Sequence, residues 1–161
     1  MDQKEDNVTN EPYTSNLVLS SELCNFTVNK IKIKIEKQIL TSYSTFFKET
    51  MTEKNFNNME FTIDYNNKYI VLFFSMLKLK NNGVDKIDII NCESLYKLSI
   101  FFGIDAITHN IINFVINNSD NKQLNKFMIN NKPTLLYNYK NPKLLNVYIV
   151  DVHWGLKASD S

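Results

Sequence analysis

The sequence predicts an α+β fold in which helices are grouped against one small sheet. Two segments, Ile31–Ile35 and Met59–Ile63, alternate apolar and polar residues with the period of two that half-buried strands show. A later segment, Asn91–Val115, repeats its apolar residues with the period of a helix and is interrupted by Gly103. The predicted order is strands, helices, a strand and further helices, which indicates the α+β class.

The composition indicates a soluble domain inside the cell. The 161 residues, of which 43% are hydrophobic, suffice to bury about two-thirds of the surface of the unfolded chain. The net charge of +1 implies no membrane partner, and the absence of arginine among 18 basic residues counts against nucleic-acid binding. Cys24 and Cys92 are too few for a disulfide scaffold, and the polar start of the chain is unlike a secretory signal. We therefore expect a cytoplasmic protein, with the nucleus as an alternative.

The first part of the chain is expected to contain a tail and then strands. Residues 1–15 offer almost nothing that can be buried and are predicted to form a flexible N-terminal tail. Leu17–Leu19 and Phe26–Val28 are predicted as short strands, with a turn at Asn29–Lys30. In the next strand, Ile31–Ile35, the isoleucines are expected to face the core and the lysines the solvent.

Helices are predicted on both sides of the strand at Met59–Ile63. Residues 39–43 suit a short helix, and Ser44 is placed to cap a second helix that runs to Met51. A polar loop is expected at residues 52–58.

The segment that follows this strand is expected to pass through a turn and a helix. Asp64–Asn67 suits the turn and cap, and Tyr69–Leu79 is predicted as a nearly all-apolar helix that is too short to span a bilayer. Asn81–Gly83 should end it, and Ile87–Ile90 is expected to form a short edge strand.

The segment Asn91–Val115 reads as two helices separated by a glycine. Asn91 is expected to cap the first helix with its side chain, and Glu93 stands where the helix dipole favours an anion. Gly103 supplies the left-handed conformation that ends a helix, and Asp105 is expected to cap the second. Both helices are too apolar to face solvent on all sides, so other elements are expected to cover them.

The C-terminal part of the sequence is more polar. A weakly amphipathic helix is expected within residues 117–131. Leu144–Val152 is apolar enough to be buried as a strand or a helix, and Trp154 is the only tryptophan.

No catalytic or metal-binding motif emerges from the reactive residues. Cys92 and His109 are the nearest approach to a nucleophile and base, but no nucleophile motif surrounds the cysteine, and His109 is expected on a polar helix face. Cysteines and histidines are scattered singly, and three glycines cannot form a phosphate-binding loop. We expect no enzyme, cofactor or metal site. The row Lys30, Lys32 and Lys34, with Lys37, is interpreted as edge-strand protection, with an acidic or nucleic-acid partner as the alternative.

Aromatic residues are numerous for a small sheet. Most are expected to fill the core, and the remainder to form exposed patches that mark protein interfaces. The residues in question are Phe46, Phe47, Phe56, Tyr65, Tyr69, Phe73 and Phe74.

Several of these segments, in this order, resemble the BTB/POZ superfamily, which includes elongin C and the F-box-binding S-phase-kinase-associated adaptor. The run Ile39–Met51 resembles the BTB segment in which a leucine, a serine and a "Y-F-[RK]" group lead to a hydrophobic residue. The run Leu95–Ile107 resembles the "L-x-x-L-A-x-x-L-x-I-x-x-L" helix pair that closes the fold. The strand Met59–Ile63 and the helix Tyr69–Leu77 fall where the family has both.

This resemblance implies a BTB/POZ-like domain over residues 16–117, with a small mixed sheet covered by a cluster of about five or six helices. Residues 118–161 would then be a C-terminal extension that packs on the domain or binds a partner. Two subtypes stay open, because the opening Leu19–Val28 is similar to that of the F-box-binding adaptor, whereas the helix around Phe46–Phe47 looks more like a BTB domain proper.

The resemblance also implies a non-enzymatic adaptor of a cullin-RING ubiquitin ligase, whose partners are a cullin and a substrate-receptor protein. The residues expected to dock the cullin are Phe46, Phe47, Met51 and Phe56. The residues expected to bind a substrate-receptor helix, or to pack back on the domain, are Leu124, Phe127, Met128 and Trp154.

The alternative is a BTB-like protein that only self-associates, as a homodimer or larger assembly. The bias toward asparagine, isoleucine and lysine suggests an AT-rich genome, such as that of a large DNA virus. A viral protein of this type would act structurally or by mimicry of host ligase adaptors.

Overall fold

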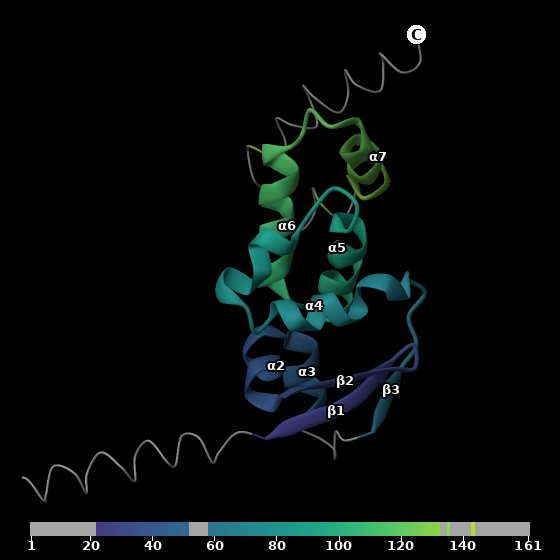
Figure 1. Ribbon diagram of the computed structural model, residues 1–161, viewed down its shortest axis with the longest axis vertical. Helices are drawn as coiled ribbons and strands as arrows, with labels where there is room; N and C mark the ends of the chain where they lie inside the picture. Colours follow the sequence, from purple (N-terminus) through teal and green to yellow (C-terminus); the bar gives the residue numbers. More distant parts are fainter. Residues whose placement is uncertain (1–21, 52–57, 133–134, 136–142, 144–161) are drawn as a thin grey trace, which may run out of the picture. The chain divides into compact units, whose positions relative to one another are not determined.

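The computed structural model describes residues 22–51, 58–132, 135 and 143. The chain divides into two compact units, Met1–Ile63 and Asp64–Ser161 (Figure 1). The described elements form a small three-stranded sheet and several helices, so the predicted α+β class is confirmed. None of the described helices has the length and apolar character needed to cross a lipid bilayer.

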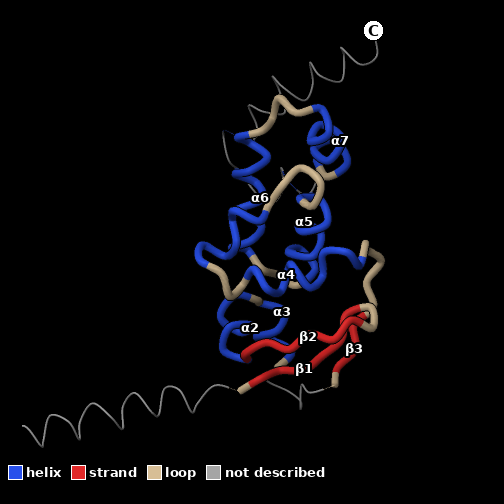
Figure 2. The backbone as a smooth tube through the Cα atoms, in the orientation of Figure 1, coloured by secondary structure: helices blue, strands red, loops and turns tan. Residues whose placement is uncertain are grey.

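The sheet of the first unit is mixed and has the order β2-β1-β3 (Figure 2). Strand β1 (Leu23–Val28) pairs antiparallel with β2 (Ile31–Glu36), and it pairs in parallel with β3 (Met59–Phe61). The turn between β1 and β2 places Asn29 and Lys30 at φ angles of 50° and 68°, the left-handed geometry that suits a two-residue hairpin. The strands predicted around Phe26–Val28, at Ile31–Ile35 and from Met59 are therefore confirmed.

The two faces of the hairpin differ in burial as the alternation predicts. The side chains of Ile33 and Ile35 are buried, whereas Lys32 and Lys34 are exposed. Helices α2 (Lys37–Tyr43) and α3 (Thr45–Thr50) follow β2 directly, and Figure 1 shows both on one side of the sheet. Apolar residues therefore gather between the sheet and these helices, because successive strand residues point to opposite faces.

The elements described in the second unit are helical. They include two 3₁₀ segments, η1 (Asn67–Tyr69) and η2 (Lys80–Lys86), and the α-helices α4 (Ile70–Met76), α5 (Cys92–Phe101), α6 (Asp105–Asn117) and α7 (Lys122–Asn130). Helices α5 and α6 lie side by side (Figure 1). The hydroxyl of Thr108 on α6 donates to the hydroxyl of Ser99 on α5 at 2.8 Å, so these two buried polar groups satisfy each other.

Gly103 separates α5 from α6 with a φ of 61°, as the sequence predicts. Asn81, Asn82 and Gly83 all have positive φ angles, but α4 already ends at Met76, so the predicted helix Tyr69–Leu79 is longer than the observed one. Asn66 caps η1, where its side-chain oxygen accepts a hydrogen bond from the Lys68 amide at 2.9 Å.

Three local predictions in the second unit are wrong. Residues 87–90 do not form an edge strand, and residues 89–91 form a turn. The side chain of Asn91 does not cap α5, because its oxygen accepts from the Asp88 amide at 2.9 Å and its nitrogen donates to the Lys86 carbonyl at 2.9 Å. Asp105 is the first residue of α6, and Ile104 occupies the cap position before it.

Asp88 takes the capping role that was expected of Asn91. Its carboxylate accepts hydrogen bonds from the amides of Ile90, at 2.8 Å, and Asn91, at 2.7 Å. The carbonyl of Asp88 also accepts from the Cys92 amide at 3.0 Å, which starts the helix. The Asp88 carboxylate thus accepts from the Asn91 amide, and the Asn91 side chain accepts from the Asp88 amide. This reciprocal pair of hydrogen bonds is the arrangement of a capping box.

Several predictions fall outside the described residues. These are the tail at 1–15, the strand at Leu17–Leu19, most of the loop at 52–58 and the apolar segment Leu144–Val152. The expected domain boundary near residue 16 lies there too, whereas residue 117 is the last residue of α6.

Candidate protein-interaction surfaces

An aromatic cluster lies between α3 and the sheet in the first unit. The ring of Phe47 lies 5.2 Å from that of Phe26 and 6.0 Å from that of Phe61, measured between centroids. The ring of Phe46 lies 5.2 Å from Phe47 and 5.5 Å from Phe61. Most of these pairs are edge-to-face or tilted, the arrangement that the charge distribution of aromatic rings favours.

Burial divides the cluster into two parts. Phe26 and Phe47 are buried, whereas Phe46 and Phe61 are each partly exposed. The exposed parts of Phe46 and Phe61 rest on a rigid aromatic support. Such a surface can bind a partner with little loss of side-chain entropy, because its rings are already held in place.

The start of α3 fixes which phenylalanine points inward. The hydroxyl of Ser44 accepts a hydrogen bond from the Phe47 amide at 3.0 Å, so Ser44 caps the helix as predicted. The hydroxyl of Thr50 donates to the Phe46 carbonyl at 2.7 Å one turn later. With the helix held at both ends, Phe47 faces the core and Phe46 lies at its margin.

The residues expected to dock a cullin differ in accessibility. Phe47 is fully buried and Met51 is 9% exposed, so their side chains stabilise the unit from within. Phe46 is the described member of this group with a partly exposed ring. Phe56 lies outside the described residues.

The described residues of the C-terminal group are buried within the second unit. Leu124, Phe127 and Met128 form the inner face of α7, with exposed fractions of 4% or less. The ring of Phe127 lies edge-on to that of Tyr96 on α5, at 5.3 Å between centroids. Trp154 lies outside the described residues.

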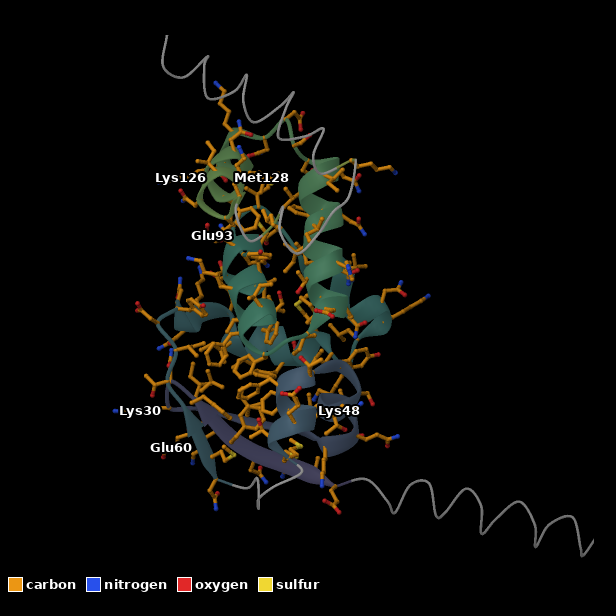
Figure 3. The ribbon with its side chains drawn as sticks, turned by 180° about the vertical axis from the view of Figure 1, so that it is seen from behind. Lys30, Lys48, Glu60, Glu93, Lys126 and Met128 are labelled. Carbon is orange, nitrogen blue, oxygen red and sulfur yellow. The ribbon has the colours of Figure 1, made fainter. Side chains whose placement is uncertain are left out.

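Polar contacts anchor the ends of α7. The side-chain oxygen of Asn121 accepts from the Gln123 amide at 2.9 Å, which caps the start of the helix. After its end, the side-chain nitrogen of Asn131 donates to the Glu93 carboxylate at 3.2 Å. Met128 lies on the buried side of α7, whereas Lys126 is exposed (Figure 3).

Sequence reasoning missed several accessible apolar residues, among them Phe61, Val71 and Ile90. Phe61 was expected only as a strand residue, although the alternation of Met59–Ile63 already puts it on the same face as Met59. In the second unit, Val71 is 58% exposed and Ile90 is 74% exposed. Both lie in segments that are apolar nearly throughout, so periodicity gave no signal for which residues face outward.

Cys92 and His109 lie in different environments. Cys92 is buried, and its thiol is 3.6 Å from the Ile89 carbonyl. Burial raises the pKa of this thiol to about 12, so the reactive thiolate is scarce at neutral pH. His109 is exposed on α6. Across the described ranges, no cluster of three histidine, cysteine or acidic side chains is placed to hold a metal ion.

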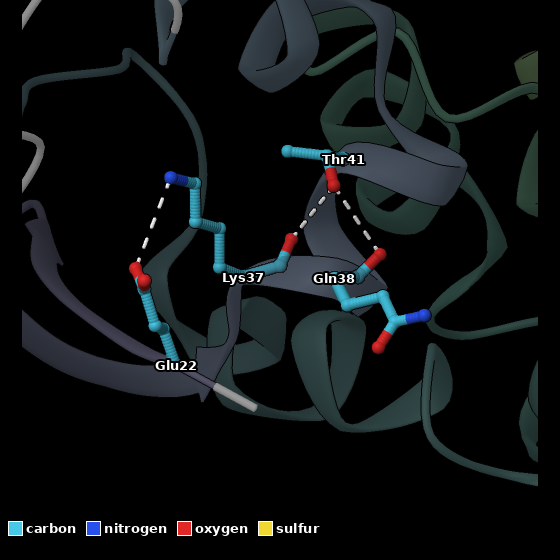
Figure 4. A network of polar contacts seen from close by, with 4 residues as sticks. All are labelled: Glu22, Lys37, Gln38 and Thr41. Carbon is cyan, nitrogen blue, oxygen red and sulfur yellow. Dashed lines mark hydrogen bonds and ion pairs between the residues drawn. The ribbon is translucent and has the colours of Figure 1, made fainter. Parts of the chain in front are cut away.

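The lysines of the row predicted on the hairpin are exposed. Lys37, which was grouped with them, has its charge paired with an acidic residue. Its ammonium group lies 3.8 Å from the Glu22 carboxylate, and its amide donates to the Glu22 carbonyl at 2.7 Å (Figure 4). The Thr41 hydroxyl donates to the carbonyls of Lys37 and Gln38, one turn earlier in α2. Among the described residues, Lys30, Lys32 and Lys34 therefore carry the positive charge of the row that has no ion-pair partner.

Comparison with known proteins gives no family for this chain. No protein family model matches it, and no curated protein sequence is significantly similar to it.

Proposed function

We propose that this chain is a non-enzymatic protein-interaction module of the BTB/POZ type that serves as an adaptor in a cullin-RING ubiquitin ligase. The observation that carries the proposal is the pair of partly exposed rings, Phe46 and Phe61, held on the buried rings of Phe26 and Phe47. Aromatic side chains seated on a rigid support are typical of the residues that dominate protein interfaces.

Three features of the fold support the BTB/POZ assignment. The small sheet is mixed, as the resemblance implies. A strand at Met59–Phe61 is followed by the helix Ile70–Met76, and the pair α5 and α6 occupies the segment that resembles the closing helix pair. Ser44 caps the helix that carries the "Y-F-[RK]"-like group Phe46–Lys48.

An adaptor needs no charge chemistry at its binding surface. An amphipathic helix of a partner can pack its apolar face against Phe46 and Phe61. This contact is favourable because it removes the exposed apolar surface of both rings from water. The surface of α7 that faces solvent, with Lys126 and Ile129, is the part of the C-terminal group left for a second partner.

Co-purification with a cullin tests the proposal. The tagged chain is expected to recover a cullin from a cell extract, and Phe46→Ala is expected to reduce recovery about tenfold or more, as for an interface hot spot. Phe56→Ala is expected to weaken recovery as well. Phe101→Ala is the matched control, because Phe101 is also a partly exposed phenylalanine but belongs to the second unit. If no cullin is recovered under conditions that retain a known adaptor, the ligase role is wrong.

A second candidate function is self-association, which the exposed apolar side chains of Val71 and Ile90 favour. Exposed apolar residues mark an interface with a second chain where they form a contiguous patch. A solution mass measurement separates the two functions. A stable homo-oligomer without affinity for a cullin would support self-association, in a viral or cellular assembly, and would overturn the adaptor role.

A further inference from the structure

The outer face of the sheet in the first unit carries a shallow groove of about 370 Å³. We call it the lysine groove, and its lining residues are Asn25, Phe26, Thr27, Lys32, Ile33, Lys34 and Asn58. The side chains of Phe26 and Ile33 are buried on the opposite face, so they contribute main-chain atoms to its floor. The side chains that line it therefore belong to polar and charged residues, and carbon atoms such as those of the lysine stems make up much of its surface.

The positive charge of the groove is concentrated along β2. Lys32 and Lys34 are separated by one residue on a strand, so their side chains leave the same face roughly 7 Å apart. Neither lysine forms an ion pair with any residue that the structure describes. Lys30 adds a third positive charge in the turn that precedes the strand.

Acidic residues lie at the edges of the same face. Glu60 on β3 is in register with Thr27, and Glu36 at the end of β2 is in register with Leu23. The strand β1 lies between Lys32 and Glu60, so the two are separated by about twice the strand spacing, or roughly 10 Å. Electrostatic attraction for an anion is therefore strongest along β2, and Glu60 repels an anion that approaches from the side of β3.

The side chains of Asn25 and Asn58 offer neutral hydrogen-bonding groups opposite the lysines. The Asn58 amide donates to the Asn25 carbonyl at 2.9 Å, which joins the segment before β3 to β1. Both asparagine side chains remain exposed at the groove. A primary amide can donate to a peptide carbonyl and accept from a peptide N–H, so it suits an extended main chain.

We propose that the lysine groove binds an extended acidic peptide of a partner protein. In such a peptide, side chains that point to one face are also two residues apart, so carboxylates at alternate positions match the spacing of Lys32 and Lys34. The peptide runs along β2, away from Glu60, and its main chain faces the amide of Asn25 on the neighbouring strand β1.

The chemistry of the groove favours a peptide over RNA. Among the described residues that line it, none has an exposed aromatic side chain on which a base could stack, and the chain contains no arginine to bind phosphate with two hydrogen bonds. Two ammonium groups act as point charges, which suit carboxylates as well as phosphates. This surface is distinct from the Phe46–Phe61 surface and does not depend on a cullin.

Fluorescence anisotropy of a short labelled peptide with glutamate at alternate positions tests the proposal. The full chain is expected to bind this probe at low ionic strength. The double variant Lys32→Gln/Lys34→Gln is expected to bind it roughly three- to twentyfold more weakly, because each exposed ion pair contributes modestly. Salt near 1 M, where the Debye length is about 3 Å, is expected to abolish binding.

Lys78→Gln/Lys80→Gln is the matched control, since these exposed lysines have the same spacing in sequence and the same total charge but lie in the second unit. It is expected to leave the affinity unchanged. Phe46→Ala is expected to do the same, so failure of the lysine groove is distinguishable from failure of the adaptor role. Equal unfolding midpoints in urea would show that the variants are folded, and Lys34→Gln alone provides a milder substitution.

Four outcomes would overturn the proposal. The first is no binding of the probe, and the second is binding that the groove variant and its control weaken equally. The third is tighter binding of oligouridylate than of the peptide, which would make the groove a nucleic-acid site. The fourth is a large gain in affinity when Asp2, Glu5 and Asp6 are neutralised, which would make the chain's own acidic segment the occupant.

Discussion

Replacing Phe47 or Phe46 with alanine separates packing from binding at two adjacent positions. Phe47 is fully buried, with the rings of Phe26, Phe46 and Phe61 all within 6.0 Å of its centroid. Truncating a fully buried phenylalanine costs about 3–5 kcal/mol, from lost burial and from the cavity that remains. Since small proteins have total stabilities of about 5–15 kcal/mol, Phe47→Ala should remove much of the free energy of unfolding of the first unit.

Phe46→Ala should cost less, because part of the ring is already exposed to water. At about 25 cal/mol per Å² of buried apolar surface, the buried part of a phenylalanine side chain that stays partly exposed corresponds to roughly 1–2 kcal/mol. The difference in burial thus predicts that Phe47→Ala loses more free energy of unfolding than Phe46→Ala. Their order in partner binding is the reverse, since the partly exposed ring of Phe46 is the one that a partner can reach.

Urea unfolding followed by circular dichroism measures both losses. Phe47→Leu is a suitable intermediate, with an expected loss between those of the two alanine variants. If Phe47→Ala loses less than about 1 kcal/mol, the ring is not in a packed core and the arrangement of α3 described above is incorrect. If Phe46→Ala destabilises the chain as much as Phe47→Ala, any loss of partner binding would reflect unfolding, and the argument for a binding role of Phe46 fails.

Three further predictions concern the second unit. Burial raises the pKa of the Cys92 thiol to about 12, from about 9 in the unfolded chain. Below pH 9 the thiol is neutral in both states, and its contribution to the free energy of unfolding is complete. Between pH 9 and 12 the unfolded chain loses the proton and the folded chain keeps it, so the free energy of unfolding falls by about 1.4 kcal/mol per pH unit. Unfolding of the wild type and Cys92→Ala across this range should differ by that slope, and parallel curves would show that the thiol is accessible to water. Asp88→Ala should lower the free energy of unfolding by about 1–2 kcal/mol, because two amides lose their hydrogen-bond acceptor. Asp85→Ala is the control, since Asp85 is exposed and its loss should change stability very little. Equal thermal midpoints of the two variants would contradict the capping role of Asp88. Gly83→Ala should destabilise the protein more than Gly103→Ala in chemical denaturation. Both glycines have positive φ angles, but a Cβ at Gly83 would also meet Met76 Cγ at 2.8 Å. The opposite order of stability would refute this packing.

The candidate surfaces were only partly predictable from the sequence. Adjacent phenylalanines at 46 and 47 look alike in any hydrophobicity pattern, and their roles separate only once Ser44 sets the start of α3. The alternation of β2 predicted that the lysines share one face of the strand. It did not predict which lysine lies beside an acidic residue. Lys37 continues the row in sequence, yet it leaves the row because Glu22 lies beside it.

The turn before α5 shows the same limit at short range. Asn91 and Asp88 are both good capping residues, and the sequence alone does not decide between them. The turn places the Asp88 carboxylate within reach of two amides and directs Asn91 back to Lys86. Residues 87–90 are apolar enough to suggest a strand, but no strand of the described sheet is paired with them.

The sequence by itself determined the features that depend on near neighbours. These are the alternation of β1 and β2, the helical period of α5 and α6, the cap at Ser44 and the break at Gly103, each set by residues within about one helical turn. Tertiary structure alone decided that β3 pairs in parallel with β1, with Phe26 opposite Met59. That pairing brings Phe61 to Phe46 and Asn58 to Asn25. Contacts between residues so far apart in sequence depend on how whole elements pack, which no local pattern specifies.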